Sequence, residues 1–196
     1  MNSSSVSLPA NARLPSGYKE PFWSDQKRVL RAHVPVDRWH WLLDRASLTH
    51  RVRQACDGPF RVALLRQTWG KISRSEAQVL HLRHGERCLV REVQLLCAER
   101  PWVFARTIIP APTLTGPQRR LRCLGTRPLG AVLFADPNMH RGTVQIAAIT
   151  ARHGIYMRAT QHLRTRPAVI WGRRSVFHVG GKPLLVSEFF LPGLGA

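Results

Sequence analysis

Residues 87–110, RCLVREVQLLCAERPWVFARTIIP, hold two apolar runs separated by the turn-forming residues Ala98-Glu99-Arg100-Pro101. Such a pattern predicts two strands joined in a β-hairpin. Side chains along a strand alternate between its two faces. One face of the first strand therefore carries a single cation, Arg91, in a row with Leu89, Val93, Leu95 and Cys97.

Arg91 needs an explanation, because a guanidinium stays charged and an unpaired buried charge is costly. Near the C-terminus, Glu188 occupies the opposite kind of position. It shares a strand face with Leu184, Val186 and Phe190, and it is the only Asp or Glu after Asp136. A buried Arg91–Glu188 ion pair is one interpretation. A pocket that receives an anionic ligand at Arg91 is the other.

The remaining apolar patterns predict an α+β protein with a single antiparallel sheet of about six strands and short helices between them. A second hairpin is expected across Gly180-Gly181, a favoured two-residue turn. Residues 1–18 are expected to form a flexible leader and residues 19–196 a single domain. The strands are expected at residues 60–70, 87–97, 102–110, 140–152, 171–179 and 182–191.

Several helix starts are indicated by capping residues. The sequence SRSE at residues 73–76 predicts a capping box, and either Ser47 or Thr49 is expected to cap a short basic helix. Thr126 is the expected N-cap of a helix that runs to about Phe134. Residues 154–167 are polar and basic, and we interpret them as a flexible insertion.

Composition narrows the class of protein without defining its ligand. The chain has 196 residues, a net charge of +19 and a pI near 11.7, so its surface attracts anions in general. The arginines are scattered without a long basic block, which favours a solvated surface. No apolar run is long enough to span a membrane, and the N-terminus lacks the pattern of a secretory signal.

The four cysteines show no CxxC spacing, so neither a disulfide framework nor a zinc site is expected. A reduced, cytoplasmic chain is the simple prediction. Histidines are dispersed, and the close pair His81 and His84 has no other obvious ligand nearby, so no metal is expected.

Five segments occur in an order that resembles the chorismate pyruvate-lyase family. They are VREVQLLCAERPWVFARTIIP, TLTGP, LGTRPLGAVLF, WGRRSVF and GKPLLVSEFFLP, and the resemblance covers roughly residues 36–192. It implies an antiparallel sheet with an internal ligand cavity beneath helical flaps. It also implies that Arg91 binds the ring carboxylate and Glu188 faces the hydroxyl end of the ring. Leu48 and Leu129 would contact the ligand through their backbone.

The resemblance further implies a function: elimination of pyruvate from chorismate to give 4-hydroxybenzoate, the first committed step towards ubiquinone. No cofactor or metal is expected, because aromatisation of the ring drives the reaction. Arg91 offers a fork for a carboxylate. Glu188 either accepts a hydrogen bond from the substrate hydroxyl or accepts a proton. The expected partners are chorismate, 4-hydroxybenzoate and pyruvate, and the protein is expected to be a monomer.

Three other functions were weighed against this one. A non-catalytic sensor of small carboxylates has the same fold in some transcription regulators, but those carry a DNA-binding domain ahead of it. A nucleic-acid-binding module is suggested by the charge, yet no aromatic stacking platform alternates with Lys and Arg. A lyase that has lost turnover is disfavoured by the presence of both Arg91 and Glu188.

Overall fold

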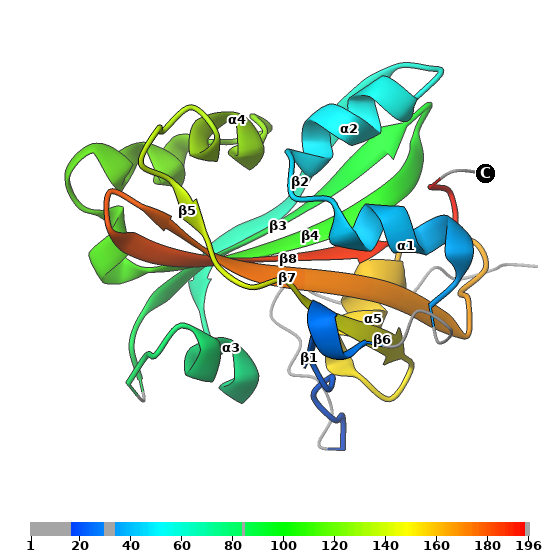
Figure 1. Ribbon diagram of the computed structural model, residues 1–196, viewed down its shortest axis with the longest axis horizontal. Coiled ribbons are helices and arrows are strands. Elements are labelled where there is room, and N and C mark those ends of the chain that lie inside the picture. The colour runs from blue at the N-terminus through cyan, green and yellow to red at the C-terminus, as the bar shows by residue number, and fades with distance from the viewer. Residues whose placement is uncertain (1–16, 30–33, 84, 195–196) are drawn as a thin grey trace, which may run out of the picture.

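The computed structural model describes residues 17–29, 34–83 and 85–194, and its centre is one antiparallel sheet. The strand order is β1-β6-β7-β8-β4-β3-β2, and β5 pairs with β7 (Figure 1). The strands are β1 Ser24–Asp25, β2 Phe60–Gly70, β3 Cys88–Cys97, β4 Arg100–Pro110, β5 His140–Arg141, β6 Gln145–Thr150, β7 Val169–Val179 and β8 Lys182–Phe190.

The expected fold class is confirmed, but the expected number of strands is wrong. The sheet has eight strands rather than about six. The difference is β1 and β5, which have two residues each. Segments of that length are too short to produce an alternating pattern in the sequence.

Short helices cover both faces of the sheet. Figure 1 shows α2 and α4 on one face and α3 and α5 on the other. In the described part of the chain, no helix is both long enough and apolar enough to cross a membrane. The α-helices are α1 Val36–Leu43, α2 Leu48–Ala55, α3 Arg74–Val79, α4 Leu129–Leu133 and α5 Gly154–Thr160; 3-10 helices cover Gln26–Arg28, Ala111–Leu114 and Gly116–Cys123.

The predicted central hairpin is formed by β3 and β4. All residues of β3 are buried, so this strand is covered on both faces. In the register, Arg91 lies opposite Thr107 and Glu92 lies opposite Arg106. Because neighbouring side chains alternate, Arg91 points to the α2/α4 face and Glu92 to the α3/α5 face.

Two of the expected helix caps are confirmed and one is wrong. Ser73 and Glu76 form the predicted capping box of α3. Ser47 caps α2, because its Oγ accepts a hydrogen bond from the backbone N–H of His50. The cap of α4 is Pro128 rather than Thr126, since a turn through Gly125 precedes the helix.

Residues 154–167 are not the flexible insertion that their polar composition suggested. They contain α5, which buries Tyr156 and Ala159 against the sheet. The Tyr156 hydroxyl donates a hydrogen bond to the backbone oxygen of Pro167 and so fixes the following loop. Of the expected N-terminal leader, residues 1–16 lie outside the described residues.

The expectation of a fully reduced chain is wrong for one pair of cysteines. Cys56 and Cys97 form a disulfide, while Cys88 and Cys123 are free. The bonded residues are 41 apart in sequence, so their spacing gives no signal. The disulfide ties the C-terminal end of α2 to the end of β3.

Candidate active site

The predicted site residues line one cavity on the α2/α4 face of the sheet. The sheet contributes residues of β2, β3, β4, β5, β7 and β8, and the cover is formed by α2, α4 and the segments before them. The cavity volume is ≈ 50 Å³, so little space remains between the cover and the sheet. The lining residues are Ala46, Ser47, Leu48, Thr49, Val62, Arg91, Val93, Leu95, Ala105, Thr107, Pro128, Leu129, Gly130, Leu133, Phe134, Arg141, Arg173, Phe177, Val186 and Glu188.

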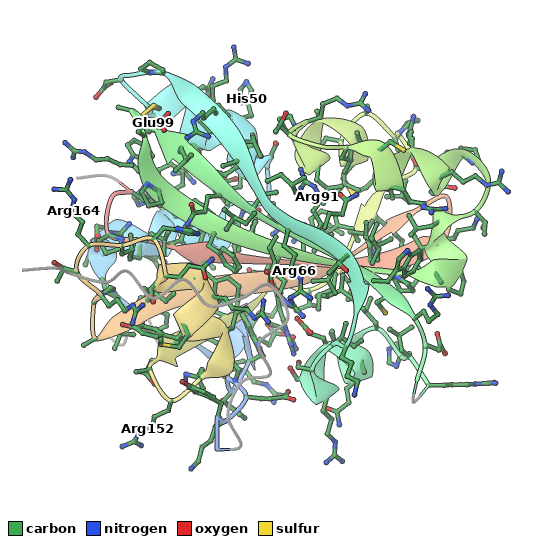
Figure 2. All side chains as sticks on the ribbon, turned by 180° about the vertical axis from the view of Figure 1, so that it is seen from behind. His50, Arg66, Arg91, Glu99, Arg152 and Arg164 are labelled. Atoms are coloured by element: carbon green, nitrogen blue, oxygen red, sulfur yellow. A yellow bond between two sulfur atoms is a disulfide. The ribbon has the colours of Figure 1, made fainter. Side chains whose placement is uncertain are left out.

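Arg91 lies in the middle of the sheet with its guanidinium in this cavity and only 2% of its surface exposed. Figure 2 shows it on the side of the sheet that α4 covers. Its Nη2 donates to the backbone oxygens of Gly125 and Arg127, at 2.9 and 3.1 Å. Its Nε is buried and has no hydrogen-bond partner among the described residues.

No carboxylate neutralises Arg91. All eleven Asp and Glu residues belong to the described part of the chain, and none of them forms an ion pair with it. Burial lowers the pKa of Arg91 below its usual value, but a guanidinium remains protonated at neutral pH. The site therefore holds a buried cation with unused donors, which suits a carboxylate ligand.

Glu188 faces the same cavity from β8, but its partner is Arg173 and not Arg91. Arg173 Nε lies 2.6 Å from Glu188 Oε2. The Arg173 side chain is 1% exposed and also donates through Nη1 to the backbone oxygens of Trp41 and Asp44. The interpretation of a buried Arg91–Glu188 ion pair is therefore wrong. Among the described residues, only Oε2 of Glu188 takes part in a hydrogen bond, so Oε1 is available to a ligand.

Leu48 and Leu129 are the first residues of α2 and α4, and both line the cavity. The first N–H groups of a helix have no acceptor within it, so these residues offer backbone donors to a ligand. The two helices approach each other closely at Gly130, where an added Cβ would lie 2.8 Å from Ser47 Oγ. A glycine at this position therefore allows the cover to close over the cavity.

Sequence reasoning gave no role to two further arginines in this cavity. Arg173 shares a strand face with Trp171 and Phe177, so the alternation of β7 carried a signal for it. Arg141 lies in the two-residue strand β5, where no alternation can be seen. Both line the cavity together with Arg91.

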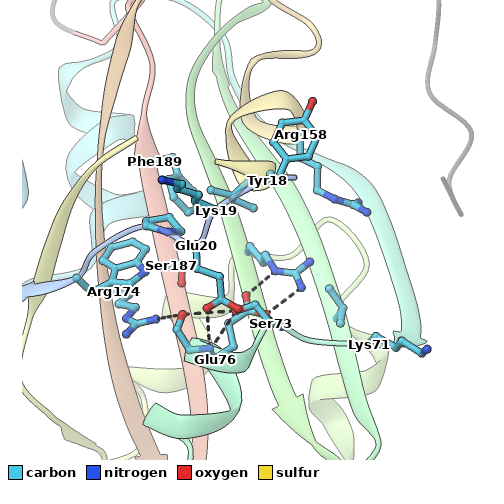
Figure 3. A pocket seen from close by; sticks show the side chains of 18 of the residues that line it. Tyr18, Lys19, Glu20, Lys71, Ser73, Glu76, Arg158, Arg174, Ser187 and Phe189 are labelled. Carbon is cyan, nitrogen blue, oxygen red and sulfur yellow. Dashed lines mark hydrogen bonds and ion pairs between the residues drawn. The ribbon is translucent and has the colours of Figure 1, made fainter. Parts of the chain in front are cut away.

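The opposite face of the sheet carries a larger cleft of ≈ 660 Å³ between α3, α5 and residues 17–21. Figure 3 shows Glu20, Glu76 and Arg174 at one end of this cleft and Tyr18 and Arg158 at the other. The carboxylate of Glu20 accepts hydrogen bonds from two backbone N–H groups of α3. Size alone thus favours this cleft, whereas the predicted site residues lie in the smaller cavity.

Arg106, in β4, lies on this opposite face in an ion-pair network. Its Nε is 2.7 Å from Glu76 Oε1 and its Nη1 is 2.6 Å from Glu92 Oε1. Arg158 joins the network through Glu92, at 3.3 Å. The charge of Arg106 is therefore neutralised within the protein, by Glu76 and Glu92.

An antiparallel sheet with helices on both faces and a positively charged cavity beneath α2 and α4 defines an α+β protein with a candidate site for a small organic anion. The chain belongs to the chorismate lyase family, whose family model matches residues 22–194. The match therefore includes the cavity, its cover and the whole sheet.

Individual relatives agree with this family. The chain is 47% identical over 158 residues to a probable chorismate pyruvate-lyase from Azoarcus sp. (strain BH72), covering 79% of this chain and 83% of the relative. It is 44% identical to a protein of the same description from Methylococcus capsulatus, covering 79% and 94%. A GntR-family transcriptional regulator from Bacillus cereus is similar in structure, with a TM-score of 0.50 and 12% identity, covering 68% of this chain and 92% of that one. That likeness concerns the fold alone.

Proposed function

We propose that this protein is a chorismate pyruvate-lyase, which converts chorismate into 4-hydroxybenzoate and pyruvate. The observation that carries the proposal is the position of Arg91 and Glu188 in one small cavity beneath α2 and α4. They come from separate strands, and Arg91 lacks a carboxylate partner among the described residues. A ring with a carboxylate at one end and a hydroxyl at the other matches this pair.

The chemistry requires no group that the chain lacks. The ether bond between the ring and the enolpyruvyl oxygen breaks, and the ring carbon that bears the hydroxyl loses its proton. The electrons of that C–H bond complete the aromatic ring. The released enolpyruvate takes up a proton and rearranges to pyruvate. The protein has to bind the substrate, exclude water and hold the reactive conformer.

In this proposal each site residue has a distinct part. Arg91 binds the ring carboxylate, with help from the backbone N–H groups of Leu48 and Leu129. Arg173 donates a hydrogen bond to Oε2 of Glu188, so that Oε1 of Glu188 faces the hydroxyl end of the ring. A cavity of ≈ 50 Å³ is far smaller than the roughly 300 Å³ of a typical ligand pocket, so α2 and α4 must move apart to admit chorismate.

The two possible parts of Glu188 can be separated with Glu188→Gln. A glutamine keeps a hydrogen bond to the substrate hydroxyl but cannot accept a proton. We expect a loss of about 100-fold or more in kcat if Glu188 is the proton acceptor, and less than about tenfold if it only positions the hydroxyl. The measurement is kcat with saturating chorismate, with 4-hydroxybenzoate affinity as a control for an intact site.

The direct test of the function is incubation of the purified protein with chorismate. The proposal predicts 4-hydroxybenzoate and pyruvate in equal amounts, at a rate that is unchanged by a metal chelator. Chorismate also decays without a catalyst, so a heat-denatured sample is the control. Tight binding of 4-hydroxybenzoate without turnover would contradict the lyase and favour a non-catalytic sensor of small carboxylates.

The cellular setting is part of the same proposal. The protein would act in the cytoplasm as a monomer and supply 4-hydroxybenzoate for ubiquinone synthesis, without a nucleic-acid partner. The high charge is consistent with a solvated surface, because side chains such as Arg152 and Arg164 project outward in different directions (Figure 2). The test is removal of this gene from a cell. We expect 4-hydroxybenzoate and ubiquinone to be lost, and added 4-hydroxybenzoate to restore ubiquinone.

A further inference from the structure

A second unpaired guanidinium, that of Arg141, lies in the proposed active site. Its Nε donates to Ser175 Oγ at 3.1 Å. Its Nη1 donates to the backbone oxygens of Asp44 and Arg45, at 3.3 and 3.1 Å. Its guanidinium carbon lies 5.2 Å from the centre of the Phe177 ring. Among the described residues, its Nη2 takes part in no hydrogen bond.

No protein carboxylate accounts for this charge. All Asp and Glu residues are in the described part of the chain, and none of them pairs with Arg141. Burial is the main reason that the pKa of Arg141 falls to about 10, with the nearby Arg173 charge acting in the same direction. The group still carries its proton at neutral pH, so a partly buried positive charge remains to be balanced.

The charges around the cavity point to a ligand with two negative charges. Three guanidiniums line it, those of Arg91, Arg141 and Arg173, and one carboxylate, that of Glu188. The net charge of the lining is therefore +2, and the Arg173–Glu188 pair accounts for none of it. Chorismate is a dianion, with one carboxylate on the ring and one on the enolpyruvyl group.

Position assigns one carboxylate to each arginine. Arg141 and Arg173 both donate to the backbone oxygen of Asp44, so Arg141 lies at the Glu188 end of the cavity. In chorismate the enolpyruvyl ether and the ring hydroxyl are on adjacent ring carbons. A ring that presents its hydroxyl to Glu188 must therefore place the enolpyruvyl carboxylate at this end, away from Arg91.

We propose that Arg141 binds the enolpyruvyl carboxylate of chorismate and so distinguishes the dianionic substrate from the monoanionic product. This inference rests on the proposed function, because it uses the lyase substrate. Arg91 serves substrate and product alike, whereas Arg141 serves the substrate alone. After the reaction, pyruvate carries away the carboxylate that Arg141 had bound, and 4-hydroxybenzoate keeps the one at Arg91.

A purely structural part for Arg141 makes a different prediction. Arg141 ties Asp44 and Arg45, which lead into α2, to β5. If Arg141 did no more than this, its replacement would loosen the cover and lower the affinity for every ligand equally. Arg51 offers a matched control, because its Nη1 also holds this segment, through His40 O and Asp44 Oδ2, without lining the cavity.

The experiment compares two stable ligands in wild type, Arg141→Gln, Arg141→Lys and Arg51→Gln. One is 4-hydroxybenzoate, and the other is 3-(carboxymethoxy)-4-hydroxybenzoate, which has a second carboxylate and cannot undergo elimination. For Arg141→Gln we expect the dissociation constant of the dicarboxylate to rise at least about tenfold and that of 4-hydroxybenzoate to change less than about threefold. Arg141→Lys should fall between, because it keeps the charge without the fork.

Equal weakening of both ligands in Arg141→Gln, as expected for Arg51→Gln, would overturn the inference, and so would no weakening of either. Should Arg141→Gln not fold, the same comparison with Arg141→Lys decides, since a selective loss of dicarboxylate affinity supports the proposal and an equal or absent loss refutes it. Neither ligand reports turnover, so a wild-type protein that fails to convert chorismate overturns the proposed function independently of this result.

Discussion

Arg91 and Arg106 lie on adjacent strands, and Arg106 is one residue away from the position opposite Arg91. The two side chains therefore face opposite sides of the sheet, where their surroundings differ. Arg106 is held by Glu76 and Glu92 within hydrogen-bond distance. Arg91 meets only the backbone oxygens of Gly125 and Arg127. Both residues are buried, with Arg91 2% exposed and Arg106 9% exposed, so burial alone does not distinguish them.

The difference between them separates structural charges from ligand-binding charges. The charge of a buried cation that has its own carboxylates is balanced within the protein, and removal of the cation leaves those carboxylates unpaired. The charge of a buried cation without carboxylate partners is balanced only when an anionic ligand binds. By this criterion Arg91 marks the α2/α4 face as the proposed ligand site. The cleft on the α3/α5 face is larger and holds Arg174, which is buried and forms no ion pair with a described residue. Its hydrogen bonds go to Gln145 and Ser75, and Glu76 and Glu20 stabilise its charge.

The largest expected effect comes from replacing each arginine by methionine, which has a similar length and no charge. For Arg91→Met we expect kcat/KM for chorismate to fall at least about 100-fold, because the ring carboxylate loses a charged partner in a dry site. For Arg106→Met we expect the free energy of unfolding to fall by roughly 3–5 kcal/mol, because Glu76 loses its buried partner.

Enzyme assays and chemical denaturation of both variants measure these effects. The comparison predicts that folded Arg106→Met keeps kcat/KM near that of wild type, whereas Arg91→Met keeps most of its stability. Arg106→Lys is the alternative if the methionine variant does not fold. Loss of activity without loss of stability in the Arg106 variants would reverse the assignment of the two faces.

A smaller effect is expected for Glu76→Gln, and it should depend on pH. Burial tends to raise the pKa of Glu76, but the charge and hydrogen bonds of Arg106 outweigh it and hold that pKa below the usual 4.5. A carboxylate with a lowered pKa contributes stability above its unfolded-state pKa and loses it as the pH falls through the folded-state value. Glutamine lacks that contribution at every pH.

Above about pH 5.5 we therefore expect the free energy of unfolding of Glu76→Gln to be roughly 3 kcal/mol lower than that of wild type. The difference should shrink below about pH 4.5, as the wild-type carboxylate takes up its proton. Denaturation curves at a series of pH values measure it. A difference that stays constant down to acid pH would mean that the ion pair with Arg106 contributes little.

The smallest expected effect concerns the cover of the cavity. A methyl group in Gly130→Ala would lie 2.8 Å from Ser47 Oγ, so α4 or α2 must shift. We expect about a tenfold weaker affinity for 4-hydroxybenzoate, because a closed cover completes the site. Isothermal titration measures this affinity.

A double-mutant cycle tests whether the contact with Ser47 is the cause. Ser47→Ala alone should cost about 1 kcal/mol of stability, because α2 loses its N-cap. Combined with Gly130→Ala, it should restore part of the affinity, because it removes the atom that the new methyl group meets. Strictly additive losses in the double variant would exclude the contact as the cause.

Most of the sheet could be predicted from the sequence, because its long strands have regular apolar patterns and clear turns. Arg91 and Glu188 were also detectable, since each is a lone charge in an apolar strand row. The same signal existed for Arg173 in β7 but is weakened by Arg174 beside it, which faces the other side. An isolated charge is thus more visible in a sequence than an adjacent pair.

Other features depend on contacts between distant segments and left no local trace. The pairing of Glu188 with Arg173 rather than Arg91 is set by the β7/β8 register, in which the two residues are directly opposite. Arg141 belongs to a two-residue strand, and the bonded Cys56 and Cys97 are brought together only by α2 and β3. Helix α5 was missed because it has only seven residues, and the polar and basic residues that follow it dominate the composition of the segment 154–167.

The most direct test of the account is a crystal structure of the protein with bound 4-hydroxybenzoate. The account predicts the ring in the cavity beneath α2 and α4, with its carboxylate on Arg91 and its hydroxyl towards Glu188. A ligand bound in the cleft between α3 and α5, with the cavity at Arg91 left empty, would contradict it.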